Sequence, residues 1–245
     1  MSGSRRILLG LWIGLVLGAA SATVAWLGFP PLSRDLAFWF VACLVGELLW
    51  VRLSAGAATI SMASCFNFAA LLVLAPREAM LVASVATIVA ELAVMRKPLV
   101  RALFNAAQTL IAVALAGWAF GALGGHETSL IDLVSRFRLL PFLAAGAIYY
   151  VVNRGTVVVV VSLAESIEIG ESWQRNFGST YDPLSCAGTL SLGALLATQY
   201  GSLGMIGTVF ILLPLVLACD GYRRFTRDSR LASPRAADEE RDRAA

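Results

Sequence analysis

A few polar side chains interrupt long apolar stretches of this sequence, and they are the residues best able to do chemistry. An ionised side chain costs about 2.5–3.5 kcal/mol at the centre of a membrane span, so such residues tend to be buried, paired and functional. Arg154 is the clearest case, because it lies within the apolar stretch YYVVNRGTVVVVV at 149–161. A charged residue there needs a partner or a function. The full set is Glu47, Asn67, Glu91, Asn105, Gln108, Asn153 and Arg154.

The composition places these residues in a membrane. Hydrophobic residues make up 58% of the 245 residues and charged residues 14%, which leaves too little polar surface for a water-soluble globule. The net charge of +3 is modest, and most arginines lie beside apolar segments, where they face lipid headgroups. We therefore expect a polytopic membrane protein whose first partner is the lipid bilayer, and no nucleic-acid partner.

Apolar segments of spanning length predict an all-α fold, a polytopic transmembrane helix bundle. A hydrocarbon core of about 30 Å needs about 20 apolar residues of helix. The third and fourth segments are short, so the sequence leaves open whether both cross fully. The expected spans, about eight in number, lie at roughly 7–29, 36–53, 59–75, 79–95, 99–123, 139–164, 183–200 and 203–219.

Basic residues near the span ends predict the orientation. Cytoplasmic loops are enriched in Lys and Arg, and an inside N-terminus puts more of these residues on the inner side, including Arg96 and Lys97. Both termini are then cytoplasmic, in a bacterial inner membrane. The transmembrane domain is expected to cover 1–222. Residues 223–245 hold many arginines and acids, which predicts a disordered, charged cytoplasmic tail.

The first span carries small residues at four-residue intervals, namely Gly10, Gly14, Gly18 and Ala22. Such a stripe lets two helices approach closely in lipid, where no hydrophobic effect drives helices together. We favour the interpretation that it is a helix-packing face inside the bundle. The alternative is a docking face for a partner or a second copy of the chain.

A short amphipathic segment follows the sixth span. In ESIEIGESWQRNFGSTYD, Ile169, Trp173, Phe177 and Tyr181 recur every four residues, with charged residues between them. This spacing predicts one short helix lying in the membrane interface with its apolar face toward lipid. A plain loop anchored by Trp173 is the competing interpretation.

The expected topology brings the intramembrane polar residues to one layer. Asn105 and Gln108 share a helix face, because they are three residues apart. The five N–H donors of Arg154 are satisfied better by a carboxylate with such amides beside it than by a lone carboxylate. We expect Glu47 as the partner of Arg154 and Glu91 as the second choice. The cluster, with Asn153, is then a structural bridge, a ligand or ion pocket, or a proton relay.

The sequence offers no set of residues for catalysis or for holding a metal. It contains no HExxH motif, no serine–histidine or cysteine–histidine set within a span, and no paired aspartates. The single histidine, His126, lies in an expected loop without nearby carboxylates at helical spacing. We therefore expect no enzyme, no metal and no cofactor.

Several motifs resemble a known family of membrane domains. They are Glu47 after a glycine in GELLWVRL, the RKP turn at 96–98, the LFNAAQ motif at 103–108, YYVVNRG at 149–155, and the proline-bearing last helix ILLPLVLACDGYRRF. Over about 36–225 the chain is similar to the multi-spanning N-terminal membrane sensor domain found ahead of bacterial HD-GYP or GGDEF signalling modules. The resemblance implies membrane sensing; no output module follows Tyr222, which implies a stand-alone domain or an output on another chain.

These observations favour a non-enzymatic inner-membrane protein that acts as a sensor-like or scaffold domain. In this hypothesis the polar cluster binds a small ligand, and the partner is a membrane or cytoplasmic signalling protein, or a second copy in a homodimer. The alternative is a membrane-embedded substrate-binding subunit, or another component, of a small-molecule transporter.

Overall fold

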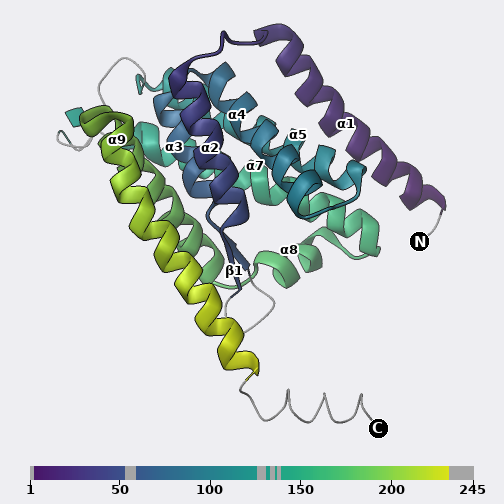
Figure 1. The fold of residues 1–245 in the computed structure, drawn as a ribbon. Helices are drawn as coiled ribbons and strands as arrows, with labels where there is room; N and C mark the ends of the chain where they lie inside the picture. The colour runs from purple at the N-terminus through teal and green to yellow at the C-terminus, as the bar shows by residue number, and fades with distance from the viewer. Residues whose placement is uncertain (1–2, 53–58, 126–130, 133–135, 137–138, 232–245) are drawn as a thin grey trace.

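Helices make up almost all of the computed structural model, which describes residues 3–52, 59–125, 131–132, 136 and 139–231 (Figure 1). The one exception is a short two-stranded hairpin, so the expected all-α class is confirmed in its main feature. The elements are α1 (Gly3–Leu27), α2 (Arg34–Leu48), β1 (Trp50–Arg52), β2 (Thr59–Ser61), α3 (Ala63–Val73), α4 (Pro76–Val89), the π-helix η1 (Ala90–Val94), α5 (Leu99–Ala122), α7 (Leu140–Glu165), α8 (Ile169–Phe177) and α9 (Tyr181–Leu231). His126 lies outside the described residues.

Four of these helices are long and apolar enough to cross a membrane. They are α1, α5, α7 and the Tyr181–Tyr222 part of α9. Helices α2, α3 and α4 have only 15, 11 and 14 residues, which is short of the about 20 that a crossing needs. The prediction of about eight spans is therefore not confirmed.

The chain breaks its helices where the local sequence favours another conformation. The hairpin pairs β1 and β2 antiparallel, with Trp50 opposite Ser61, and so shortens the segments expected as spans at 36–53 and 59–75. Three of the six strand residues, Val51, Thr59 and Ile60, are β-branched, which suits a strand. Pro76 begins α4 directly after α3 ends, because proline lacks the N–H that a continuing helix needs.

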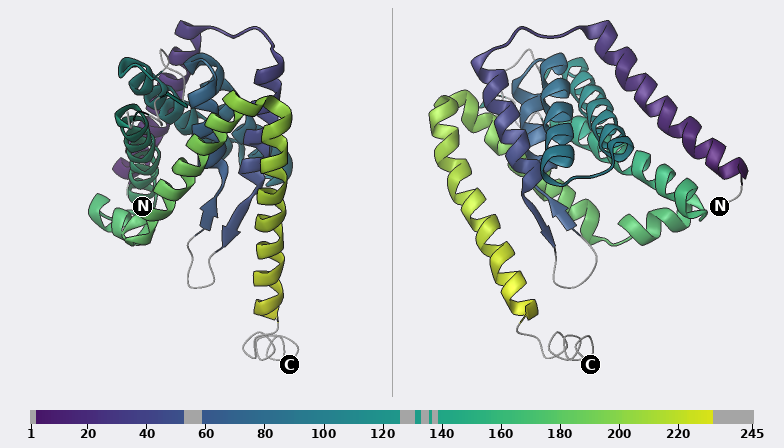
Figure 2. Two further views of the ribbon diagram at one scale, coloured as in Figure 1. Left: turned by 90° about the vertical axis from the view of Figure 1, so that its left-hand side faces the viewer. Right: turned by 45° about the vertical axis from the view of Figure 1, so that its right-hand side comes forward.

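Helix α9 consists of two arms that meet at Gly204. This residue has φ 65° and ψ −167°, a conformation open essentially to glycine alone. The first arm rises along the bundle and the second returns beside it (Figure 2). The two arms correspond to the spans expected at 183–200 and 203–219. The helix continues to Leu231, beyond the expected domain end at 222, and residues 232–245 lie outside the described part.

The core is centred on α3, which is buried along nearly its whole length. Helices α2 and α9 approach it closely because each presents a glycine. A Cβ built on Gly46 would lie 2.5 Å from the Phe66 ring, and one built on Gly193 would lie 2.5 Å from the backbone oxygen of Cys65. The short α3 is thus enclosed by longer helices.

The stripe of small residues on α1 points away from the bundle. A Cβ added at Gly10, Gly14 or Gly18 would meet nothing within 4 Å, and Ala22 is exposed. The buried residues of α1 are instead Val16 and Ala20. The favoured interpretation of this stripe as an internal packing face is therefore wrong, because α1 turns a different side toward the bundle.

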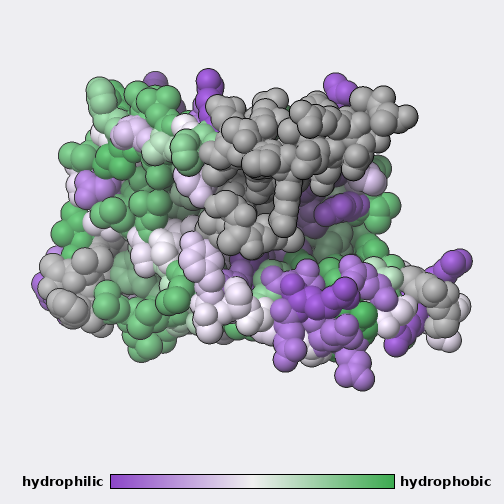
Figure 3. All heavy atoms as spheres, turned by 90° about the horizontal axis from the view of Figure 1, so that it is seen from below, coloured by the Kyte–Doolittle hydropathy of each residue, from purple (hydrophilic) through white to green (hydrophobic). Residues whose placement is uncertain are grey.

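Seen from below, a group of hydrophilic side chains lies on part of the face, with hydrophobic side chains over much of the rest that is coloured (Figure 3). Helix α8 lies in the lower part of the molecule in Figure 1. A helix is therefore present where the sequence predicts the short interfacial one, although Tyr181 belongs to α9.

Replacing Gly193 by alanine should destabilise the fold. The added methyl group would meet the backbone of α3, and overpacking of this kind costs about 1–3 kcal/mol. Gly188→Ala, on the same helix, is the matched control: it meets nothing within 4 Å and should be neutral or gain up to about 1 kcal/mol. Unfolding by denaturant in detergent micelles measures both, and equal behaviour of the two variants would contradict this packing.

Candidate functional site

A polar cavity of about 1040 Å³ lies among α2, α3, α4, η1, α5 and α7. Every member of the predicted polar cluster lines it. These residues are Glu47, Glu91, Asn105, Gln108, Asn153 and Arg154. Asn67, from the wider set of intramembrane polar residues, lines the same cavity. The sequence therefore identified the side chains that come together, although the pairing among them differs from the expectation.

Glu91 is positioned by an irregular helix end. Helix α4 passes into the π-helix η1, in which the Met95 N–H bonds to the Ala90 oxygen, and Arg96 then adopts a positive φ of 52°. Such single π turns are frequent at functional sites. The reversal brings Lys97 back onto Glu91, to whose carboxylate its ammonium group donates at 2.5 Å.

Asn105 supplies the second contact to Glu91. Its Nδ2 donates to both carboxylate oxygens, at 2.7 and 3.0 Å. Glu91 is only 4% exposed, so its charge is neutralised by a lysine and stabilised by an amide rather than by water. From the sequence, Lys97 was interpreted only as an orientation signal. Its position just after the helix end that bears Glu91 was the available clue that it pairs with Glu91.

Glu47 binds Thr87 and not Arg154. The Thr87 hydroxyl donates to Glu47 Oε1 at 2.6 Å. Thr87 and Glu91 are four residues apart, so both point from the same side of α4 and its π extension. The first-choice pairing of Arg154 with Glu47 is therefore wrong, and so is the second choice, Glu91.

Arg154 is paired with Asp182, in the first turn of α9. Arg154 Nη2 lies 3.0 Å from Asp182 Oδ1, and the Tyr150 hydroxyl donates to Asp182 Oδ2 at 3.0 Å. The guanidinium also lies over the Phe177 ring, 4.7 Å from its centroid. Asp182 was missed because it ends the segment interpreted as interfacial. The clue was that Tyr150 and Arg154 are one turn apart on α7, facing the helix that follows.

Two buried amide oxygens in the cavity lack a partner. Gln108 Nε2 donates to the backbone oxygen of Asn153 at 3.1 Å, whereas Gln108 Oε1 accepts no hydrogen bond from any described residue. Asn67 Oδ1 also has none among the residues that the structure describes. Asn67 and Gln108 are 2% and 6% exposed. A buried acceptor without a donor costs about 1–3 kcal/mol, so a bound molecule with N–H or O–H groups would be stabilised here.

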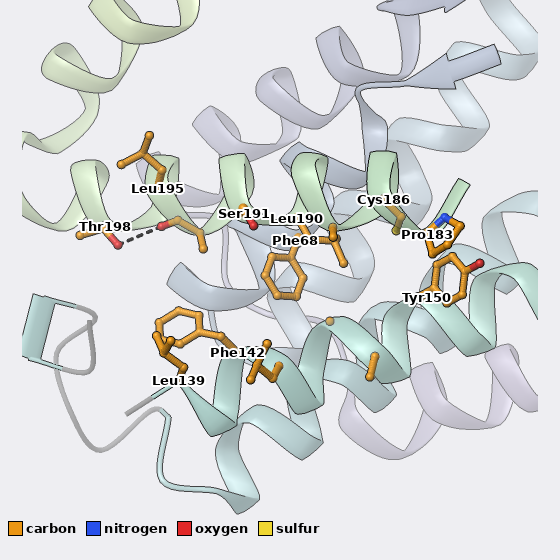
Figure 4. A pocket seen from close by; sticks show the side chains of 15 residues that line it. Phe68, Leu139, Phe142, Tyr150, Pro183, Cys186, Leu190, Ser191, Leu195 and Thr198 are labelled. Carbon is orange, nitrogen blue, oxygen red and sulfur yellow. Dashed lines mark hydrogen bonds between the residues drawn. The ribbon is translucent and has the colours of Figure 1, made fainter. Parts of the chain in front are cut away.

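A second cavity, of about 550 Å³, has a different character (Figure 4). It lies between α7 and the first arm of α9, with Phe68 of α3 at its side. Its Tyr150 and Thr198 hydroxyls are already engaged, with Asp182 and the Ala194 oxygen. The remaining lining is almost wholly apolar, which suits hydrocarbon and gives no basis for recognising a polar molecule. The polar cavity is therefore the candidate site.

The polar cavity lies entirely within a recognised family range. A family model described as MASE9 matches residues 31–220, which includes every residue that lines this cavity and leaves out α1. No curated protein and no solved structure matches the chain.

A double-mutant cycle should locate the partner of Arg154. We expect Arg154→Leu and Asp182→Leu to be coupled by about 0.5–3 kcal/mol in the free energy of unfolding, because each change alone leaves the other group uncompensated. Arg154→Leu with Glu47→Leu serves as the matched control and should be close to additive. Coupling of Arg154 to Glu47 that equals its coupling to Asp182 would contradict the observed pairing.

Proposed function

The chain belongs to the MASE9 family, and from this membership together with the polar cavity we propose a non-enzymatic membrane sensor domain that holds a small polar ligand. MASE domains are multi-spanning membrane-associated sensor domains. The long apolar helices agree with this, and the chain is a membrane protein. The finer expectations, a bacterial inner membrane and cytoplasmic termini, are part of the proposal.

The observation that carries this proposal is the pair of unpartnered, buried amide oxygens on Asn67 and Gln108. A protein interior normally satisfies such groups. Both residues line a cavity that also holds charged side chains, and its size is at the upper end of ordinary ligand pockets, about 300–1,000 Å³. A site built only to hold the helices together would not need this space.

Arg154 connects the cavity to helix α9, so ligand binding in the cavity can change how α9 is held. It lines the cavity and also binds Asp182, at the start of α9. Helix α9 then runs through both arms to Leu231, at the lower end of the bundle (Figure 1). In the proposal, a ligand that shifts Arg154 alters how α9 is held, and a signalling partner or a second copy responds to the change.

Cysteine labelling in membrane vesicles tests whether the cavity admits polar molecules. The four native cysteines are first replaced by alanine, and Asn105→Cys is introduced as the reporter. We expect a small polar methanethiosulfonate reagent to label this cysteine, because Asn105 lines the cavity. Val151→Cys, on the exposed side of α7, is the control and should not be labelled when it faces lipid.

The same reporter tests for a ligand. A small-molecule extract of the source cells should slow labelling of Asn105→Cys, because an occupied cavity excludes the reagent. An unlabelled reporter, or labelling that the extract leaves unchanged, would argue against the proposal. Solute uptake that is lost in Arg154→Leu would instead favour the transporter alternative.

A further inference from the structure

The buried part of the polar cavity is short of positive charge. Glu47 and Glu91 both line it, and Glu47 lies within electrostatic reach of Glu91 and Lys97. Lys97 forms an ion pair with Glu91, so its one positive charge has to compensate the negative charges of two carboxylates. Within the part of the chain that the structure describes, Glu47 receives one hydrogen bond, from the uncharged Thr87. Its carboxylate is therefore the group in the cavity whose charge is least compensated.

The buried side-chain atoms of the cavity lining that lack a partner among the described residues are of one kind. These atoms, Asn67 Oδ1 and Gln108 Oε1, are both acceptors. The amide nitrogen of Gln108 is held by Asn153, which leaves its oxygen as the free end. Together with Glu47, these residues present oxygen acceptors and a negative charge from α2, α3 and α5.

The cations lie nearer the rim and are mostly neutralised. Arg154 is paired with Asp182, and the side chains of Lys97 and Arg154 are each 28% exposed. Arg101 also lines the cavity and is exposed, and it forms no ion pair with any residue in the described ranges. The cavity thus offers an unpaired carboxylate inside and an unpaired guanidinium at its edge.

We propose that the ligand is a small amphoteric molecule whose ammonium or guanidinium group enters the interior. Its N–H donors bind Glu47, Asn67 and Gln108, and a carboxylate at its other end faces Arg101. An ammonium group has three donors and no acceptor, which matches the three acceptors of the interior. Burial makes such charge-assisted hydrogen bonds stronger than neutral ones. The cavity volume of about 1040 Å³ suits an organic molecule better than a bare ion.

This inference rests on the proposed function and narrows it to one ligand class. The purified full chain in lipid nanodiscs is heated with γ-aminobutyrate, putrescine or glutarate, which carry an ammonium and a carboxylate, two ammonium groups, or two carboxylates. We expect γ-aminobutyrate to raise the unfolding midpoint most, because binding to the folded state stabilises it. Putrescine should act more weakly, since its second cation faces Arg101, and glutarate should not act.

Substitutions then locate the ammonium group. Glu47→Gln keeps an acceptor for Thr87 but removes the charge, and should weaken γ-aminobutyrate binding by about tenfold or more. Glu171→Gln, an exposed carboxylate on α8, is the matched control and should bind as the parent does. Asn67→Leu, which removes a buried acceptor, provides a second variant in case Glu47→Gln does not fold.

The outcomes separate this inference from the proposed function. The proposal of an amphoteric ligand is overturned if only glutarate raises the unfolding midpoint, or if γ-aminobutyrate and putrescine both leave it unchanged. It is also overturned if Glu47→Gln binds γ-aminobutyrate as tightly as the parent does. If Asn105→Cys is still labelled and protected by cell extract, the sensor cavity itself stands. If that reporter is never labelled, both proposals fail.

Discussion

Charged side chains inside an apolar bundle must find compensation within the protein, and this constraint organises the surroundings of the polar cavity. Glu91 is held by Lys97 and Asn105, and Arg154 by Asp182. Each pair joins residues from different segments, so the pairs also fix how the segments meet. Removing one member of such a pair leaves the other member charged, and neither lipid nor apolar side chains can stabilise that charge. The arrangement around the polar cavity is therefore determined by electrostatics as much as by packing.

Backbone features bring these partners within reach of one another. The π turn and the positive φ of Arg96 return Lys97 to Glu91. Helix α8 and the start of α9 place Asp182 beside α7, 28 positions after Arg154 in the sequence. Gly193 lets the first arm of α9 pack directly on α3, and Gly204 returns the second arm along the bundle. The site thus depends on irregular backbone at a few positions between regular helices.

Asp182 binds one residue from the lining of each of the two cavities. On one side its carboxylate binds Arg154, which lines the polar cavity, and on the other it binds Tyr150, which lines the apolar one. The first turn of α9 is therefore linked to the linings of both cavities through one residue.

The sequence by itself determined the helical class, the membrane character and the identity of the cluster, because lipid penalises polar side chains wherever they lie along a span. It also indicated the short helix at 169–177. It did not determine that Arg154 binds Asp182 rather than Glu47, that the stripe at Gly10, Gly14 and Gly18 faces outward, or how many segments reach spanning length. Those features were decided only by the tertiary structure, because they depend on which helices are neighbours, at what height, and with which face turned inward.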